Sequence, residues 1–283
     1  MLNLNKFILG SAQFSGKYGI SNSKALSFKE VDQIIKYSYQ KGIKFIEVCS
    51  SYGDSQYKII KSLKTSRLIN KFNSIYKLNK IQNDTLKFIK LLRENSKLKA
   101  IFAHNTNFFF SKKFQTLIKQ IDKKEFKIGV SIYEIKELDM LINSKIKPNI
   151  IQVPYNIFNK KFDKKKIIQK LNKIGIQIHV RSIFNQGLIF LSNQKLKLMF
   201  KKNYSYFEKF NSKLLEFHED IFDISVKLPF SKKYFKKILI GISSKKQIDS
   251  LLKVNTKKIN IRLVKVIENL KFNNKKITDP RKW

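Results

Sequence analysis

The chain has 283 residues, 42% of them hydrophobic, which is enough to bury one large core. Its formal net charge is +39, but the 59 basic residues are 54 Lys and 5 Arg and are spread along the whole chain. Because recognition of phosphates and base edges usually enriches Arg in a cluster, this composition favours a solvated lysine surface over specific binding of nucleic acid.

Compartment signals are few. Cys49 is the single cysteine, so it cannot form an internal disulfide, and nothing indicates an oxidising compartment. The opening MLNLNKFILGSAQF lacks a long apolar region followed by a cleavage site, and no stretch approaches the roughly 20 apolar residues of a membrane span. We expect a cytoplasmic protein without a membrane segment, and the sequence carries no signal for its oligomeric state.

Short apolar runs alternate along the chain with longer segments of helical period. The predicted strands are FILGS (7–11), KFIEV (44–48), NSIYK (73–77), KAIFAH (99–104), KIGVSI (127–132), NIIQVPY (149–155), IQIHVRS (176–182) and KILIGIS (237–243). Repeated strand and helix units of this length are typical of a parallel sheet covered by helices. We therefore predict an α/β fold, a single (β/α)8 TIM barrel over residues 1–283.

Helix boundaries carry their own signals. Ser27 with Glu30 and Ser244 with Gln247 have the spacing of a capping box, in which each side chain bonds the other residue's backbone at a helix start. Gly42 and Gly175 stand where a left-handed residue closes a helix before the next strand.

Two segments depart from the repeat. Strands seven and eight are far apart, and we predict a long loop at about 184–211 over the barrel mouth, where it can shape a substrate pocket. We also predict one extra helix at about 258–271 that packs against the barrel.

Polar residues gather where the second, third and fourth strands end. Glu47 and Tyr52 belong to FIEVCSSYGDS, Lys77 ends the third strand, and His104 ends the fourth. The carboxyl ends of barrel strands converge on one mouth, so we expect these four side chains to meet there.

At this point the sequence resembles the aldo/keto reductase family over most of its length. FIEVCSSYGDS is similar to the family's second-strand signature, with Glu47 where the family has Asp, and GVSIY, IIQVPYNIF, IHVRSIFNQG and ILIGISS are similar to its later segments, in the same order. The resemblance implies that Tyr52, Lys77, His104 and Glu47 are catalytic.

The implied reaction is hydride transfer from a nicotinamide to a substrate carbonyl. Tyr52 gives the oxygen a proton, and the ammonium of Lys77 is expected to lower the pKa of that phenol toward working pH. His104 orients the carbonyl, and Glu47 holds Lys77. A Glu carboxylate sits roughly 1.5 Å farther out than that of Asp, and misplacement of about 1 Å can cost on the order of a hundredfold in rate.

Cofactor contacts also follow from the resemblance, because no G-x-G-x-x-G fingerprint follows the first strand. The resemblance implies seven contacts. Ser131, Gln152 and Arg181 are expected at the nicotinamide, and Ser182 at the pyrophosphate. Gly241, Ser243 and Lys245 are expected at the phosphates of the adenosine end. Arg181 stands where the family often has an aromatic ring, and a guanidinium can stack there instead. Lys245 favours NADP, with NAD as the alternative.

Three hypotheses follow. The first is an NADP-dependent reductase of an aldehyde, ketone or sugar. The second is a nicotinamide-binding barrel that has lost turnover and acts as a sensor or partner subunit, which Glu47 and Arg181 keep open. The third, least favoured, is a basic nucleic-acid-binding protein. His179 and His218 lack partners at metal-ligand spacing, so we expect no metal.

Overall fold

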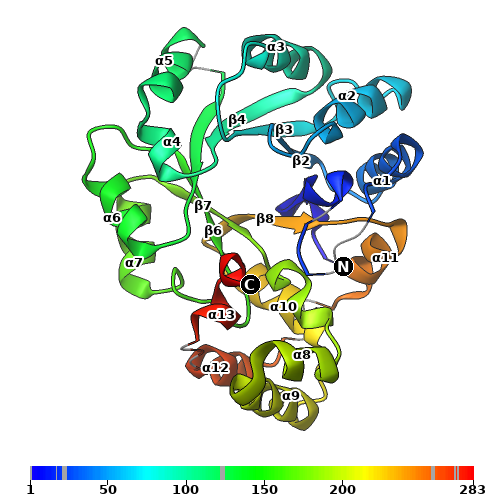
Figure 1. The fold of residues 1–283 in the computed structure, drawn as a ribbon, viewed down its shortest axis with the longest axis vertical. Coiled ribbons are helices and arrows are strands. Elements are labelled where there is room, and N and C mark those ends of the chain that lie inside the picture. The colour runs from blue at the N-terminus through cyan, green and yellow to red at the C-terminus, as the bar shows by residue number, and fades with distance from the viewer. Residues whose placement is uncertain are drawn as a thin grey trace.

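A closed barrel of eight parallel strands forms the centre of the computed structural model, which describes residues 2–16, 18–20, 24–121, 125–255, 259–270, 272 and 274–283 (Figure 1). The strands are β1 (Phe7–Gly10), β2 (Phe45–Cys49), β3 (Asn73–Leu78), β4 (Lys97–Ala103), β5 (Lys127–Ser131), β6 (Ile150–Pro154), β7 (Gln177–Arg181) and β8 (Phe235–Gly241). They pair in chain order, and β8 closes the barrel by pairing with β1. The predicted barrel is confirmed, and every predicted strand overlaps an observed one.

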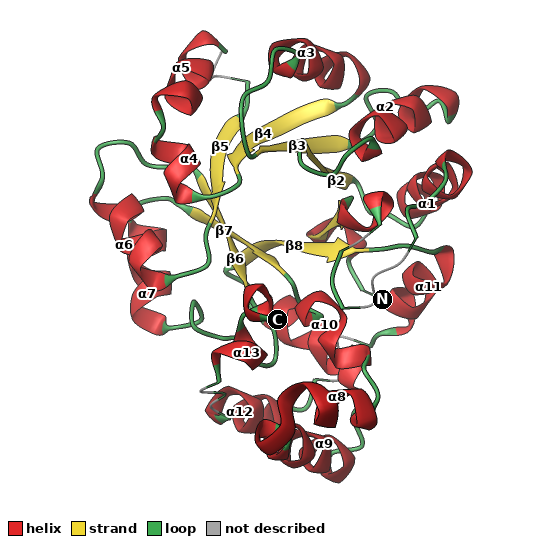
Figure 2. Ribbon diagram, viewed as in Figure 1, coloured by secondary structure: helices red, strands yellow, loops and turns green. Residues whose placement is uncertain are grey.

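Helices surround the barrel on its outer side (Figure 2). They are α1 (Phe28–Gln40), α2 (Ser55–Thr65), α3 (Thr85–Asn95), α4 (Thr106–Phe110), α5 (Lys112–Gln120), α6 (Ile135–Asn143), α7 (Lys165–Lys173), α8 (Asn193–Phe200), α9 (Ser205–Glu216), α10 (Ile221–Ser231), α11 (Lys245–Lys253), α12 (Ile261–Asn269) and α13 (Lys275–Thr278). Ser27 and Glu30 form the predicted capping box at α1. Ser244 caps α11, but the Gln247 side chain accepts from the Ser243 N–H instead of closing the box.

The barrel interior changes from apolar to polar toward the carboxyl ends of the strands. The part of the interior before this polar layer holds a buried cluster of Ile8, Ile75, Ala100, Phe102 and Ile150. Gly129 leaves room for one of these, because a Cβ there would lie 2.5 Å from the Phe102 ring. Side chains two residues apart on a strand face the same side. The inward positions that follow Ile75 and Ile150 are therefore Lys77 and Gln152, which begin the polar layer.

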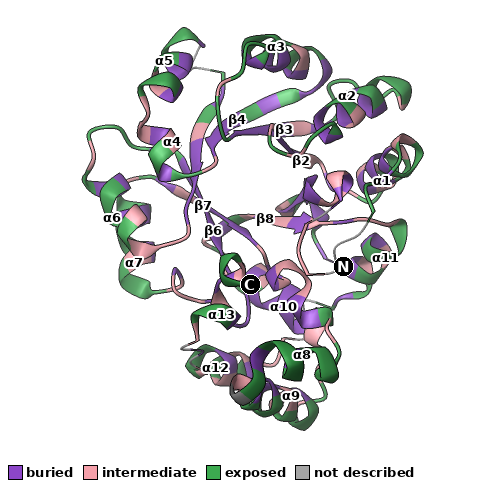
Figure 3. Cartoon of the chain, in the orientation of Figure 1, coloured by how far each residue is buried: buried purple, intermediate pink, exposed green. Residues whose placement is uncertain are grey.

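Burial follows the same plan. The strands are mostly buried, and the outer faces of the surrounding helices are exposed (Figure 3). The larger apolar cluster lies between the strands and the helices. No helix among the described residues is long and apolar enough to cross a membrane.

The long loop predicted at about 184–211 is wrong as a description of this segment. It contains the 3-10 helix η3 (Asn185–Phe190), α8, the short η4 (Lys201–Asn203) and the first half of α9. Leu196, Phe200, Phe207 and Phe210 are buried at helical spacing, and their burial makes these turns stable. Figure 1 shows α8 and α9 grouped with α12 at one side of the barrel.

The chain ends near the carboxyl ends of the strands. α12 lies inside the range where we expected one more helix, while residues 258 and 271 of that range are outside the described residues. α13 and the 3-10 helix η5 (Pro280–Lys282) then form a tail, defined here as residues 274–283.

Candidate active site

A cavity of about 480 Å³ opens at the carboxyl ends of the strands. Among the predicted residues, nine line it: Glu47, Tyr52, Lys77, His104, Ser131, Arg181, Ser182, Gly241 and Ser243. The four residues predicted to be catalytic therefore share one cavity. Gln152 and Lys245 do not line it.

A buried ionic triangle forms one wall of this cavity. The Lys77 Nζ donates to Glu47 Oε1 at 2.8 Å and to Gln152 Oε1 at 2.6 Å, and the Gln152 Nε2 donates to Glu47 Oε2 at 2.7 Å. All three side chains are almost fully buried. The expected contact of Glu47 with Lys77 is present. Gln152 does not line the cavity, and both ends of its amide bond the ion pair.

Tyr52 lies in the turn after β2, where its backbone N–H bonds the Cys49 carbonyl. Its ring stands edge to face against Tyr18, with ring centroids 6.3 Å apart. Burial raises the pKa of the Tyr52 phenol well above its ordinary value, and Arg181 is the cation that opposes this rise. This differs from the expected lowering by Lys77, because burial dominates the pKa of the phenol. The described contacts of the Lys77 ammonium go to Glu47 and Gln152.

His104 follows β4, and its backbone N–H bonds the Leu78 carbonyl of the neighbouring strand. Burial lowers the pKa of its imidazole to about 4, and the charge of Lys77 acts in the same direction. The ring is therefore neutral near pH 7. A neutral imidazole keeps one N–H donor and one acceptor, so it can orient a substrate oxygen without adding charge.

The residues expected at the nicotinamide lie close together. The Arg181 Nε donates to Ser131 Oγ at 3.1 Å, and its Nη1 donates to Ser182 Oγ at 3.4 Å. Ser182 has φ +57, a left-handed backbone that costs a side-chain-bearing residue on the order of 1 to 3 kcal/mol. Asn156 holds this strained turn by donating from Nδ2 to the Ser182 carbonyl at 3.0 Å.

Two loops meet across the cavity. The Ile20 N–H donates to the Gln186 carbonyl at 3.0 Å, which joins the segment after β1 to the turn after β7. Gly19 has φ +79, and a Cβ on it would lie 2.4 Å from the same carbonyl oxygen. This close approach requires glycine, and we call this contact the loop bridge.

The β8 end of the cavity carries buried polar atoms that can meet a polar ligand. The Gln13 amide packs against Gly241 and fills the space that a Cβ there would take. The Ser11 Oγ and Gln13 Oε1 are buried without a partner among the described residues, and both residues line the cavity. Such unpaired polar atoms fit a bound polar ligand. Lys245 lies on α11 outside the cavity wall, 6.0 Å from the centre of the Tyr37 ring.

Five residues that shape this site were not singled out from the sequence. Tyr18, Tyr133, Phe190 and Phe222 line the cavity, and Arg281 of the tail lies against Tyr133. Tyr133 directly follows the fifth strand, and this position at a strand end is a signal that could have identified it. Arg281 has no such signal, because the tail reaches the site only through the folded chain.

Comparisons with known proteins agree with this architecture. A family model described as the Aldo/keto reductase family matches residues 116–271, which is more than half of the chain. A thermostable aldo-keto reductase, solved with the inhibitor epalrestat, is 17% identical with a TM-score of 0.66, covering 93% of this chain and 94% of that one. A Bombyx mori aldo-keto reductase in complex with NADP is 13% identical with a TM-score of 0.64, and the match covers 98% of this chain and 92% of that one. A comparison with curated proteins finds no match.

Proposed function

The chain belongs to the aldo/keto reductase family, and from this premise we propose that it is an NADP-dependent reductase of an aldehyde, ketone or sugar carbonyl, with Tyr52 as the proton donor. The observation that carries the proposal is the meeting of Tyr52, Lys77, His104 and Glu47 in one cavity. A reduced nicotinamide supplies the hydride when it is bound.

Tyr52 supplies the proton that the substrate oxygen needs. Its raised pKa keeps the phenol protonated throughout the neutral range, so the donor is loaded when substrate arrives. His104, neutral at the same pH, donates an N–H to the carbonyl oxygen and fixes its direction.

Lys77 supplies positive charge beside the developing oxyanion. An ammonium has three N–H donors, and two of those on Lys77 go to Glu47 and Gln152. The third is left for the phenol oxygen of Tyr52 as the proton leaves it. Glu47 therefore positions Lys77 and does not touch the substrate, and the longer carboxylate in place of Asp suits a triangle that includes Gln152.

The cofactor would lie between the loops that follow β5, β7 and β8. Ser131 and Arg181 would contact the nicotinamide, Ser182 the pyrophosphate, and Gly241 with Ser243 the phosphates near α11. Lys245 would meet a 2′-phosphate from outside the cavity, which favours NADP over NAD. Gln152 would act on the nicotinamide only indirectly, through the triangle. The small carbonyl substrate, with a sugar as one candidate, and a cytoplasmic location complete the proposal.

Oxidation of NADPH in the presence of small aldehydes, ketones and aldoses tests it. We expect turnover by the wild type and a loss of at least about a hundredfold in Tyr52→Phe, which keeps the ring and removes the proton. Equal rates in the two proteins would contradict the role of Tyr52. Tight NADPH binding without turnover of any substrate in the panel would favour the sensor hypothesis instead.

A further inference from the structure

Arg181 brings a buried positive charge to the cavity and has no carboxylate partner among the described residues. It is 7% exposed, and its three described acceptors are the uncharged Ser131 Oγ, the Ser182 Oγ and the Ile132 carbonyl at 3.3 Å. No ion pair with an acidic residue is formed by Arg181 within the described part of the chain. The charge of this guanidinium is therefore available to whatever the cavity binds.

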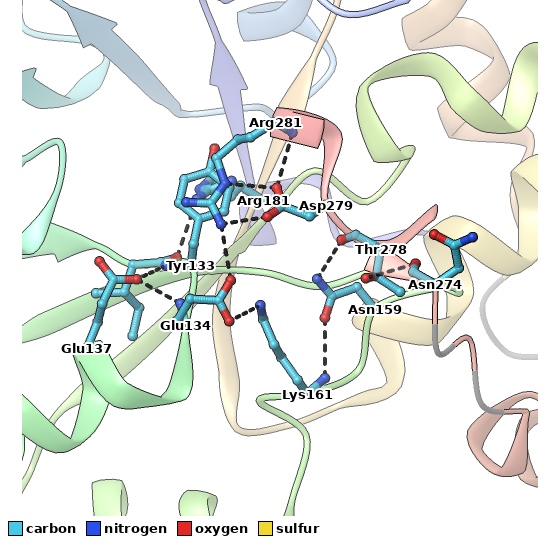
Figure 4. Close-up of polar contacts among 11 residues, drawn as sticks. Tyr133, Glu134, Glu137, Asn159, Lys161, Arg181, Asn274, Thr278, Asp279 and Arg281 are labelled. Atoms are coloured by element: carbon cyan, nitrogen blue, oxygen red, sulfur yellow. Dashed lines mark hydrogen bonds and ion pairs between the residues drawn. The ribbon is translucent and has the colours of Figure 1, made fainter. Parts of the chain in front are cut away.

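The Tyr133 ring lies between Arg181 and Arg281, a residue of the tail. The guanidinium carbon of Arg181 lies 4.0 Å from the centre of the Tyr133 ring, and that of Arg281 lies 3.7 Å from the same centre. One face of the ring has no room for two guanidinium planes at these distances, so they occupy opposite faces. Figure 4 shows the side chains of Arg281, Tyr133 and Arg181 together, and we call this stack of three the column.

The tail holds its end of the column firmly. The Asn185 Nδ2 donates to the Ile277 carbonyl at 2.8 Å, and the Asn159 Nδ2 donates to the Thr278 carbonyl at 2.9 Å. Arg281 is neutralised by Asp279 at 2.6 Å and by Glu134 at 3.1 Å (Figure 4). Of the two cations in the column, only Arg181 lacks a balancing carboxylate in the described part of the chain, and it is the one that lines the cavity.

We infer that Arg181, positioned by Tyr133 and Arg281, makes this site bind the neutral reduced nicotinamide in preference to the cationic oxidised form. The inference rests on the proposed function. One face of the guanidinium is covered by Tyr133, which leaves the other face for a planar ring. An oxidised nicotinamide ring carries a positive charge and is repelled there, whereas the reduced ring is uncharged and keeps only the stacking contact.

The charge of Arg181 would favour one oxidation state of the cofactor over the other. Two unit charges about 4 Å apart at an effective dielectric near 20 repel by more than the energy of a tenfold change in affinity. The site would fill with reduced cofactor and release the oxidised form readily, which suits a reductase. An aromatic ring at this position would lack that discrimination.

Equilibrium binding tests the inference without turnover. The dissociation constant of NADPH is measured by its fluorescence and that of NADP+ by calorimetry, and the NADH and NAD+ pair is measured in the same way. We expect the oxidised form to bind at least about tenfold more weakly to the wild type, and this ratio to fall about tenfold in Arg181→Gln. Arg181→Lys keeps the charge and should keep the ratio within about threefold, even where both affinities drop.

The outcomes separate the claims. If the wild type binds neither form, the proposed function is overturned together with this inference. If both forms bind and Arg181→Gln leaves the ratio unchanged, only the inference is overturned.

The role of the tail has its own variant. Arg281→Gln releases one face of Tyr133, so we expect the ratio to fall about threefold as Arg181 loses its fixed position. Arg93→Gln removes an arginine from an exposed ion pair with Glu125 and serves as the matched control, with no change expected. A ratio in Arg281→Gln equal to that of the control overturns the positioning role of Arg281.

Discussion

Replacing Glu47 with Gln tests the buried triangle directly. The substitution keeps the shape of the side chain and removes its charge, which leaves the Lys77 ammonium, 3% exposed, without a counter-ion. Breaking a buried pair in this way costs roughly 3 to 5 kcal/mol of unfolding free energy, because the remaining charge has lost both water and partner. This is a large share of the roughly 5 to 15 kcal/mol that a folded domain has in total.

Urea unfolding followed by circular dichroism measures this cost. Lys77→Met in the Glu47→Gln background removes the second charge as well, and we expect the double variant to recover most of the lost stability, since neither charge then remains buried. Glu125→Gln breaks the ion pair between Arg93 and Glu125, which are 42% and 49% exposed. This control should cost at most about 1 kcal/mol of unfolding free energy. A cost for Glu47→Gln as small as the control, or additive costs in the double variant, would refute the reasoning.

Three further predictions concern other parts of the molecule. Gly19→Ala would push a Cβ into the Gln186 carbonyl and break the loop bridge, so we expect NADPH affinity to drop about tenfold or more in fluorescence titrations, and an unchanged affinity would contradict this. Burial lowers the pKa of His179 to about 3, so its contribution to stability is complete above pH 6.5 and is lost as the pH falls toward 3. Between pH 7 and pH 5 the wild type should therefore lose roughly 2 kcal/mol more than His179→Leu in urea unfolding, and parallel pH curves would argue against this. Lys245→Glu should weaken the affinity for NADPH about tenfold more than the affinity for NADH in binding assays. Equal losses of affinity for both cofactors would show that Lys245 does not contact the 2′-phosphate.

The barrel could be predicted from the sequence because each strand is a short apolar run between amphipathic helices. That Tyr52, Lys77 and His104 line one cavity could be predicted for a related reason, since residues at or just after strand ends converge in any parallel barrel. These arguments need only the order of residues along the chain and the geometry of one repeated unit.

Other features depend on contacts between distant segments, and sequence reasoning missed them for that reason. The spacing of Gln152 places it facing inward, but only the closed barrel shows that Glu47 and Lys77 use both ends of its amide. Burial in the folded chain raises the pKa of Tyr52 and outweighs the opposing charge of Arg181. The segment at 184–211 is predicted as a loop because strands seven and eight are unusually far apart, although Ser192 marks the start of α8 as a capping residue.

The hydrogen bonds that hold the tail backbone against the barrel have an evolutionary consequence. Asn159 and Asn185 bind main-chain carbonyls, which every amino acid possesses, so the course of the tail does not depend on most of its side chains. We expect close homologues to vary at Thr278 while they keep both asparagines. Selection should then act on the few tail positions whose side chains matter, among them the fully buried Ile277 and the arginine that stacks on Tyr133.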